Sequence, residues 1–270
     1  MIFASDLDHT LIYSKRSMGD EHRNSELIPV ELHNNEYRSF MTQNTLSLLQ
    51  QVMQVSTFVP VTTRTVEQYK RVFHISENLK TKYAVTSNGG NILIDGMPDP
   101  IWAKRIKVAS DRCLDPAEIN KLFEEISSPE WVLRGYLADG LFFTYMIDQT
   151  KIPIDIVENF RIKLACLGWS LSIQGRKLYL IPTEINKGNA VKYLKEVLSC
   201  SFVAASGDSL LDESLLMAAD FAVAPSHGEL FSTYKNSGAY NFTKAVGIVA
   251  AEEILKSVLD AFKLRQVTSA

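Results

Sequence analysis

The sequence predicts an α/β protein in which a doubly wound parallel sheet is interrupted by an inserted α+β domain. Up to about residue 90, short apolar runs of strand length alternate with helical patterns, which is typical of a parallel sheet flanked by helices. Between about residues 91 and 183, strand patterns paired around turn residues indicate hairpins and an antiparallel sheet. The strand–helix alternation then returns. We therefore predict a core of residues 1–90 and 184–270 and an inserted domain of residues 91–183.

The composition argues against several classes of protein. The chain of 270 residues is long enough to bury a substantial core, and its net charge of −3 gives no reason to expect a nucleic-acid or anionic membrane partner. No apolar run approaches the ~20 residues that span a bilayer, and no signal peptide is expected. The three cysteines form no Cys-x-x-Cys pair, which favours free thiols in a reducing compartment. We expect a cytoplasmic protein that is a monomer or a homodimer.

The first predicted strand begins at Ile2 and ends in two carboxylates, Asp6 and Asp8. Residues i and i+2 of an extended chain point the same way, so these side chains converge at the carboxyl end of the strand, where open α/β sheets bind ligands. Two carboxylates this close repel one another unless a cation lies between them. The pair therefore indicates a hard cation such as Mg²⁺, although a lone Asp-x-Asp is more often an acidic turn.

A polar loop over residues 13–27 and a hairpin are expected next. Predicted strands at 28–32 and 37–40 flank His33-Asn34-Asn35-Glu36, where the asparagines suit a tight turn. Two interpretations of this hairpin are equally open: a flap over the site, or a surface excursion without a role. Thr42 is expected to cap the helix that follows.

Two further predicted core strands end in polar residues. Residues 57–61 form the second strand, which Pro60 weakens because proline donates no ladder hydrogen bond, and Thr62-Thr63-Arg64 follow it. A capping box, Thr65-Val66-Glu67-Gln68, then opens a helix. Residues 83–86 form the third strand before Ser87-Asn88-Gly89-Gly90, whose glycines allow backbone amides to approach a ligand closely.

The inserted domain and the second part of the core complete the pattern. In the inserted domain we expect hairpins of strands 131–137 with 141–147 and 169–174 with 177–181, and helices that begin near Asp115 and Pro153. In the second part of the core we expect a helix that begins at Asn186-Lys187-Gly188-Asn189 and then a strand at 202–205, which leads to Asp208 and Asp212. A helix at 214–219, a strand at 221–224 and a helix at 246–264 are expected after them.

In this order, the motifs resemble those of the haloacid dehalogenase (HAD) superfamily, in particular the Cof-like and sucrose-phosphate-phosphatase-like enzymes with a large α+β cap. The first motif of the superfamily, Asp-x-Asp-x-Thr-Leu, is similar to Asp6-Leu7-Asp8-His9-Thr10-Leu11, and its Thr-Gly-Arg motif is similar to Val61-Thr62-Thr63-Arg64. Its Lys-Gly motif is similar to Asn186-Lys187-Gly188, and its Gly-Asp-Ser-x-Asn-Asp motif is similar to Gly207-Asp208-Ser209-Leu210-Leu211-Asp212. An Asn-Gly element that precedes the cap in these enzymes is similar to Ser87-Asn88-Gly89-Gly90. The resemblance spans residues 2 to about 224. The sequence departs from it at His9 and Thr63, where glycine is usual, and at Leu211, where asparagine is usual.

The resemblance implies a HAD-like Rossmannoid core, a Mg²⁺ cofactor and hydrolysis of a small-molecule phosphate ester, with a sugar phosphate as the best guess. It implies that Asp6 is the nucleophile, forming an aspartyl-phosphate, and that Asp8 is the general acid and base. Thr62 and Lys187 would stabilise the transferring group. The implied phosphate-binding residues are Leu7, Thr62, Thr63, Arg64, Asn88, Gly89 and Lys187, and the implied metal ligands are Asp6, Asp8 through its carbonyl, Asp208 and Asp212. The cap would exclude water and select the leaving group.

Two other functions remain open at this point. A phosphomutase would use the same aspartyl-phosphate but return the group to the substrate. A catalytically silent sugar-phosphate-binding or regulatory protein would keep the fold without turnover, against which the retained Asp6, Asp8, Lys187 and Asp208 argue. Each residue alone also has an ordinary explanation, such as a helix cap for Thr62 or Asp208.

Overall fold

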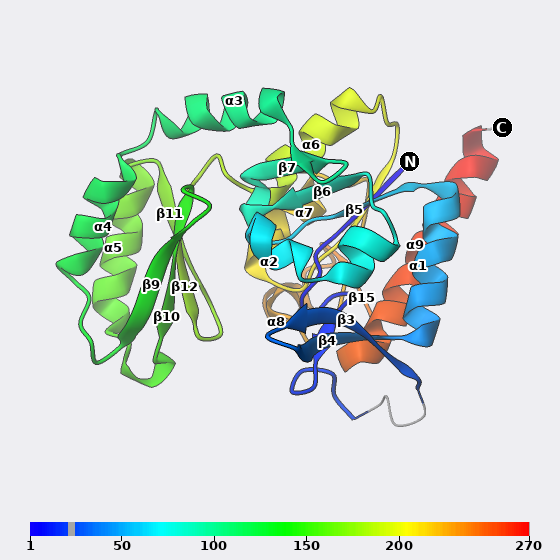
Figure 1. Cartoon of the computed structure of the whole chain (residues 1–270), viewed down its shortest axis with the longest axis horizontal. Helices are drawn as coiled ribbons and strands as arrows, with labels where there is room; N and C mark the ends of the chain where they lie inside the picture. The colour runs from blue at the N-terminus through cyan, green and yellow to red at the C-terminus, as the bar shows by residue number, and fades with distance from the viewer. Residues whose placement is uncertain (21–24, 270) are drawn as a thin grey trace. The chain divides into compact units, whose positions relative to one another are not determined.

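The computed structural model describes residues 1–20 and 25–269 and divides into two compact units (Figure 1). The core unit comprises Met1–Pro98 and Lys187–Ala270, and the inserted unit comprises Asp99–Asn186. The inserted unit begins later than the predicted residue 91, because residues 91–98 form strands that pair with a strand of the core. Within the predicted loop 13–27, residues 21–24 lie outside the described residues.

A five-stranded parallel sheet forms the centre of the core unit. Its strand order is β15 (Asn241–Phe242), β14 (Phe221–Ala224), β13 (Val203–Ser206), β1 (Ile2–Ser5), β5 (Thr57–Pro60). The amides of Thr57 and Val61 donate to carbonyls of the neighbouring Met1 and Ser5. Backbone N–H groups along a strand point alternately to its two sides, and at position 60 this group would point away from β1. The missing N–H of Pro60 therefore removes no hydrogen bond to β1.

Helices flank this sheet, as buried parallel strands require. All four residues of β1 are buried, and Phe3 shares an apolar cluster with Phe58 and Ala204 of the adjacent strands and with helices α1 (Gln43–Val55) and α9 (Ala250–Ser269). Helices α1 and α9 lie side by side (Figure 1). Helix α6 (Lys187–Val197) packs on α7 (Glu213–Met217), and α7 contacts β13 and β14. The predicted parallel sheet with flanking helices is confirmed.

Smaller elements complete the core unit. Strand β2 (Tyr13–Ser14) pairs with β4 (Glu36–Thr42), β4 forms the predicted hairpin with β3 (Leu27–His33), and a separate antiparallel sheet contains β6 (Tyr83–Thr86), β7 (Asn91–Ile94) and β8 (Met97–Pro98). The short helices are α2 (Val66–Lys70), the π-helix η1 (His74–Asn78), the 3₁₀ helices η2 (Ser87–Gly89), η4 (Leu210–Asp212) and η5 (Gly247–Val249), and α8 (Glu229–Tyr234). Asn34 and Asn35 have φ of 52° and 60°, which the tight β3–β4 turn requires.

The inserted unit is an α+β domain. Its antiparallel sheet has the order β11 (Trp169–Gln174), β12 (Lys177–Pro182), β10 (Phe142–Ile147), β9 (Val132–Ala138). Its helices are α3 (Pro100–Ser110), α4 (Pro116–Glu124), the 3₁₀ helix η3 (Gln149–Lys151) and α5 (Ile154–Cys166). Trp131 and Trp169 are buried in one cluster with Phe123, Phe143 and Phe160, so these rings form the core of the domain.

Candidate active site

The carboxyl ends of β1, β5 and β13 meet at one edge of the central sheet. Asp6 directly follows β1, and its amide donates to the carbonyl of Ser206 at the end of β13 (2.9 Å). After β5, the amide of Val61 donates to the carbonyl of Ser5 (2.7 Å). Polar residues that follow these strands are therefore brought to the same place, where open α/β sheets bind ligands.

Three carboxylates and one ammonium group form the centre of the site. Carboxylate oxygens of Asp6, Asp208 and Asp212 lie within 4.8 Å of one another. The Nζ of Lys187, the first residue of α6, donates to Asp6 Oδ1 (2.6 Å) and to Asp212 Oδ1 (2.5 Å). Lys187 and Asp212 are buried. The structure thus brings together four predicted site residues from three separate segments of the chain.

Burial and mutual repulsion favour the protonated forms of the Asp6 and Asp208 carboxyl groups. Burial raises the pKa of Asp6 to about 7, with Lys187 opposing the shift and Asp212 and Asp8 adding to it. Burial likewise raises the pKa of Asp208 well above its usual range, and the charges of Asp212 and Asp6 increase the effect. Burial alone would lower the pKa of Lys187, but Asp212 and Asp6 outweigh it and raise that pKa instead. One ammonium group does not balance three carboxylates, so this donor set fits a divalent cation.

Asp212 organises the loop after β13. Its Oδ2 accepts hydrogen bonds from the amides of Asp208 (3.1 Å) and Ser209 (2.9 Å) and from the Ser209 hydroxyl (2.8 Å). Gly207 permits this arrangement, because a Cβ at that position would lie 2.3 Å from the Cβ of Asp212. Asp212 therefore shapes the loop that presents Asp208, and its direct contact with a metal ion stays a prediction.

The ends of β5 and β6 are tied together by hydrogen bonds. The buried Thr62 Oγ1 accepts from the amide of Arg64 (3.1 Å), which leaves the hydroxyl hydrogen for another acceptor. The amide of Asn88 donates to the carbonyl of Thr62 (3.0 Å), and the amide of Gly90 donates to the carbonyl of Ser87 (3.0 Å). The amides of Asn88 and Gly90 thus donate to carbonyls inside the protein. The predicted phosphate contacts of Leu7, Thr63, Asn88 and Gly89 stay predictions.

The backbone of His9 explains why glycine is usual at this position. Its φ of 60° lies in the left-handed region that favours glycine. The His9 carbonyl accepts hydrogen bonds from the Tyr13 hydroxyl (2.8 Å) and from His227 Nε2 (3.0 Å). His227 Nδ1 accepts from the amide of Gly247 (3.1 Å), which assigns the ring hydrogen to Nε2. These contacts stabilise the turn that follows Asp8.

Asp8 forms a two-point ion pair with Arg64. The Nε and Nη2 atoms of Arg64 each lie 2.7 Å from one oxygen of the Asp8 carboxylate. The other N–H groups of the guanidinium donate to Glu31 and to the carbonyl of Gln68, so all five are used by protein acceptors. The predicted phosphate contact of Arg64 stays a prediction. The sequence prediction omits Glu31, for which the available signal is an acidic residue inside the apolar run 28–32.

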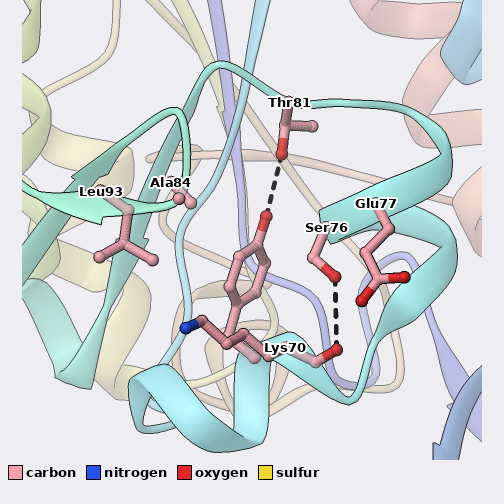
Figure 2. Close-up of a pocket in the computed structure, with 8 residues that line it drawn as sticks. Lys70, Ser76, Glu77, Thr81, Ala84 and Leu93 are labelled. Atoms are coloured by element: carbon pink, nitrogen blue, oxygen red, sulfur yellow. Dashed lines mark hydrogen bonds between the residues drawn. The ribbon is translucent and has the colours of Figure 1, made fainter.

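A separate pocket of about 370 Å³ lies among α2, η1, β6 and β7 (Figure 2). It is lined by Tyr69, Lys70, Ser76, Glu77, Thr81, Ala84, Leu93 and Gly96. The Tyr69 and Thr81 hydroxyls form a hydrogen bond of 2.9 Å across it. These lining residues include no member of the acidic cluster, so we do not place the chemistry in this pocket.

Comparison with known families decides the identity of the fold and the class of enzyme. A model of the sucrose-6F-phosphate phosphohydrolase family matches residues 1–263. The chain belongs to this family. As a member of the sucrose-6F-phosphate phosphohydrolase family, it is a phosphatase of the HAD superfamily, which confirms the resemblance found in the motifs.

Solved structures agree in fold across nearly the whole chain. The sucrose-phosphatase of Synechocystis sp. PCC6803, solved with sucrose and phosphate, is 17% identical, with a TM-score of 0.69 over 96% of this chain and 97% of that one. A HAD-superfamily phosphatase from Bacteroides thetaiotaomicron is 14% identical, with a TM-score of 0.57 over 97% and 94%. A trehalose-6-phosphate phosphatase related protein is 15% identical, with a TM-score of 0.54 over 100% of both chains. The comparison with curated protein sequences found no match.

Among the described residues, no helix combines the length and the apolar character that are needed to cross a bilayer.

Proposed function

We propose that this phosphatase is a Mg²⁺-dependent phosphomonoester hydrolase that acts on a sugar phosphate through an aspartyl-phosphate on Asp6. The observation that carries the proposal is the cluster of Asp6, Asp208 and Asp212, in which Lys187 pairs with the buried Asp6 and Asp212. The substrate class is supported by the family description, by the sucrose and phosphate bound in the Synechocystis enzyme, and by the trehalose-6-phosphate phosphatase related neighbour.

The acidic cluster supplies the ligands for the cation. Asp6, Asp208 and the carbonyl of Asp8 would hold Mg²⁺, and Asp212 would support Asp208 or bind the ion itself. When bound, the ion neutralises phosphate charge and allows a carboxylate to approach phosphorus. This assignment fits the raised pKa values of Asp6 and Asp208, because a cation would favour their ionised forms.

The reaction then follows from the side chains. An oxygen of Asp6 attacks phosphorus, the bond between phosphorus and the sugar oxygen breaks, and the proton of the Asp8 carboxyl group passes to the leaving alcohol. Asp8 next accepts a proton from water, which attacks phosphorus and releases inorganic phosphate and free Asp6. Lys187 and the Thr62 hydroxyl would stabilise the charge on the transferring group. Selection of the leaving group by the inserted domain stays a prediction.

A substrate screen tests this function. We expect inorganic phosphate to be released from at least one member of a panel of hexose and disaccharide phosphates with Mg²⁺, and release to stop when EDTA removes the ion. Asp6→Asn should lower kcat by at least ~10³-fold, because an amide cannot form the covalent intermediate. Isomerised sugar phosphate without phosphate release would favour a phosphomutase, and no turnover on any ester would favour a silent binding protein. Either outcome would reject the hydrolase.

A further inference from the structure

We propose that Glu31 on the β3–β4 hairpin is a positioning residue for Asp8, and that it acts through Arg64. The proposal rests on the proposed function, which makes Asp8 the proton donor to the leaving alcohol. It gives the hairpin a specific part in the reaction. Neither family membership nor the sequence motifs assign a role to Glu31.

The guanidinium of Arg64 is shared between two carboxylates. Its Nε and Nη2 face Asp8, its Nη1 lies 2.6 Å from Glu31 Oε1, and its Nη2 lies 3.0 Å from Glu31 Oε2. A planar guanidinium fixes the angle between these two edges. The plane in which Glu31 holds Arg64 therefore also determines the plane of the Asp8 carboxylate.

Glu31 is itself held firmly, because it is buried and its carboxylate is bound by a residue of the facing strand. Its Oε2 accepts a hydrogen bond of 2.5 Å from the Ser39 hydroxyl on β4. The register of the hairpin shifts on both sides of Glu31, and Val30 and Glu31 are both buried, although consecutive strand residues normally face opposite sides. The irregularity thus turns Glu31 toward Arg64.

The hairpin is also fixed to the element that follows Arg64. The amide of Leu32 donates to the carbonyl of Arg71, just after α2, at 3.0 Å. Burial would raise the pKa of Glu31, but the hydrogen bonds and charge of Arg64 and the Ser39 hydroxyl outweigh it and lower that pKa. The lowered pKa favours the ionised form of Glu31 beside Arg64. The contacts favour a functional hairpin over a surface excursion.

Asp8 needs this support because its own surroundings are open. The Asp8 side chain is 42% exposed, whereas the side chains of Arg64 and Glu31 are 14% and 9% exposed. An exposed carboxyl group has several accessible rotamers, and proton transfer requires one of them. Arg64 selects that rotamer, and Glu31 prevents Arg64 from turning away.

The test uses esters that differ in their need for a proton donor. The leaving group of 4-nitrophenyl phosphate departs readily as an anion, whereas that of phenyl phosphate gains more from protonation. Glu31→Gln keeps the size of the side chain but presents one acceptor oxygen in place of two. We expect kcat/KM to fall about tenfold more for phenyl phosphate than for 4-nitrophenyl phosphate. Equal losses for both esters, or no loss, would overturn the proposal.

Two further variants make the test specific. Glu36→Gln is the matched control, because Glu36 lies on the same hairpin but is exposed and pairs with Arg38; neither ester should be affected. Ser39→Ala removes one hydrogen bond from Glu31 without removing its charge. In this variant kcat/KM should again fall more for phenyl phosphate than for 4-nitrophenyl phosphate, but by a smaller factor than in Glu31→Gln. If Glu31→Gln does not fold, the proposal is judged by the ratio of the kcat/KM values for the two esters in Ser39→Ala.

A crystal structure of Glu31→Gln separates this proposal from the proposed function. We expect Arg64 to lose its two-point contact with Asp8 in the variant. If both hydrogen bonds between Arg64 and Asp8 persist, Glu31 is not a positioning residue, whatever the enzyme hydrolyses. If the contact is lost but the wild-type protein releases no phosphate from any ester, the proposed function fails while the structural role of Glu31 stands.

Discussion

Lys187 determines the charge balance of the candidate site. Its ammonium group is within hydrogen-bonding distance of two buried carboxylates, Asp6 and Asp212, and is itself almost completely buried. A buried ion pair contributes little compared with an apolar replacement of the whole pair, but removal of one partner leaves an uncompensated buried charge. We therefore expect Lys187 to contribute to stability as well as to the proposed chemistry.

We expect Lys187→Met to lower both stability and activity. The free energy of unfolding at neutral pH should fall by about 3–5 kcal/mol, because Asp6 and Asp212 lose their counter-charge. The value of kcat should fall at least ~10²-fold, because a donor to the transferring group is lost. Urea unfolding and phosphate release measure the two effects.

Lys195→Met is the control for this prediction. Lys195 lies on the same helix and pairs with Asp220, but both side chains are about one-third exposed. Such a pair is worth at most about 1 kcal/mol, so the control should retain activity and nearly all stability. A Lys187→Met protein as stable as this control would contradict the charge balance described for the site.

The contact between α6 and α7 sets the position of Lys187. Gly188 is the second residue of α6, and a Cβ there would lie 2.1 Å from the carbonyl oxygen of Ser214 and 2.7 Å from its carbon. These are backbone atoms, which cannot move away as a flexible side chain can. The close packing of the two helices thus depends on the absence of a side chain at Gly188.

Gly188→Ala should therefore push the start of α6 away from α7. We expect a loss of about 1–3 kcal/mol in the free energy of unfolding, as for overpacked cores, with a loss of activity because Lys187 moves with the helix. Thermal unfolding and kinetics on the same samples measure both. Lys192→Ala, at an exposed position of α6, should behave as the wild type. An active and fully stable Gly188→Ala would show that the helix start tolerates the displacement.

The elements differ in how far local sequence determines them. The strands that lead to Asp6, Thr62 and Asp208 are predictable, because an apolar run and the polar residues after it are adjacent in sequence. Glu31 is not, because its contacts with Arg64 and Ser39 depend on how the hairpin is turned. The partner of the Asn88 amide is not predictable either, because a glycine-rich turn suggests free donors, whereas this amide donates to the carbonyl of Thr62 after β5. Strands of two residues, such as β15, and the short α8 carry too few residues for a periodic pattern.

The core unit as a whole depends on segments from both ends of the chain. β1 lies between β5 and β13, so the acidic cluster exists only when residues before and after the inserted unit have come together. The raised pKa values of Asp6 and Asp208 mean that this assembly brings negative charges into a buried place at a cost in stability. A cation bound there would reduce the cost.

The stability of the protein should therefore depend on pH, and the stabilisation by Mg²⁺ should itself depend on pH. In the metal-free protein, Asp6 has a pKa of about 7 when folded and an ordinary value of 3.8 when unfolded, so the folded state binds more protons between these values. The contribution of Asp6 to stability must then fall as pH rises from about 4 to about 7. Asp6→Asn lacks this titration, so the wild type should lose stability relative to the variant over that range in EDTA.

Comparison with Asp6→Asn also cancels the contributions of other groups that make stability rise, rather than fall, with pH. Burial lowers the pKa of His74 and His227, which makes stability rise with pH, but both proteins share those residues. Saturating Mg²⁺ should stabilise the wild type above pH 7 by about 2.7 kcal/mol at a hundredfold excess over Kd, and should stabilise Asp6→Asn less. If urea midpoints of the two proteins shift together with pH and Mg²⁺, the cation does not bind at Asp6. A larger Mg²⁺ effect at high pH than at low pH would place it among ionised carboxylates, since protonated ones are poor ligands.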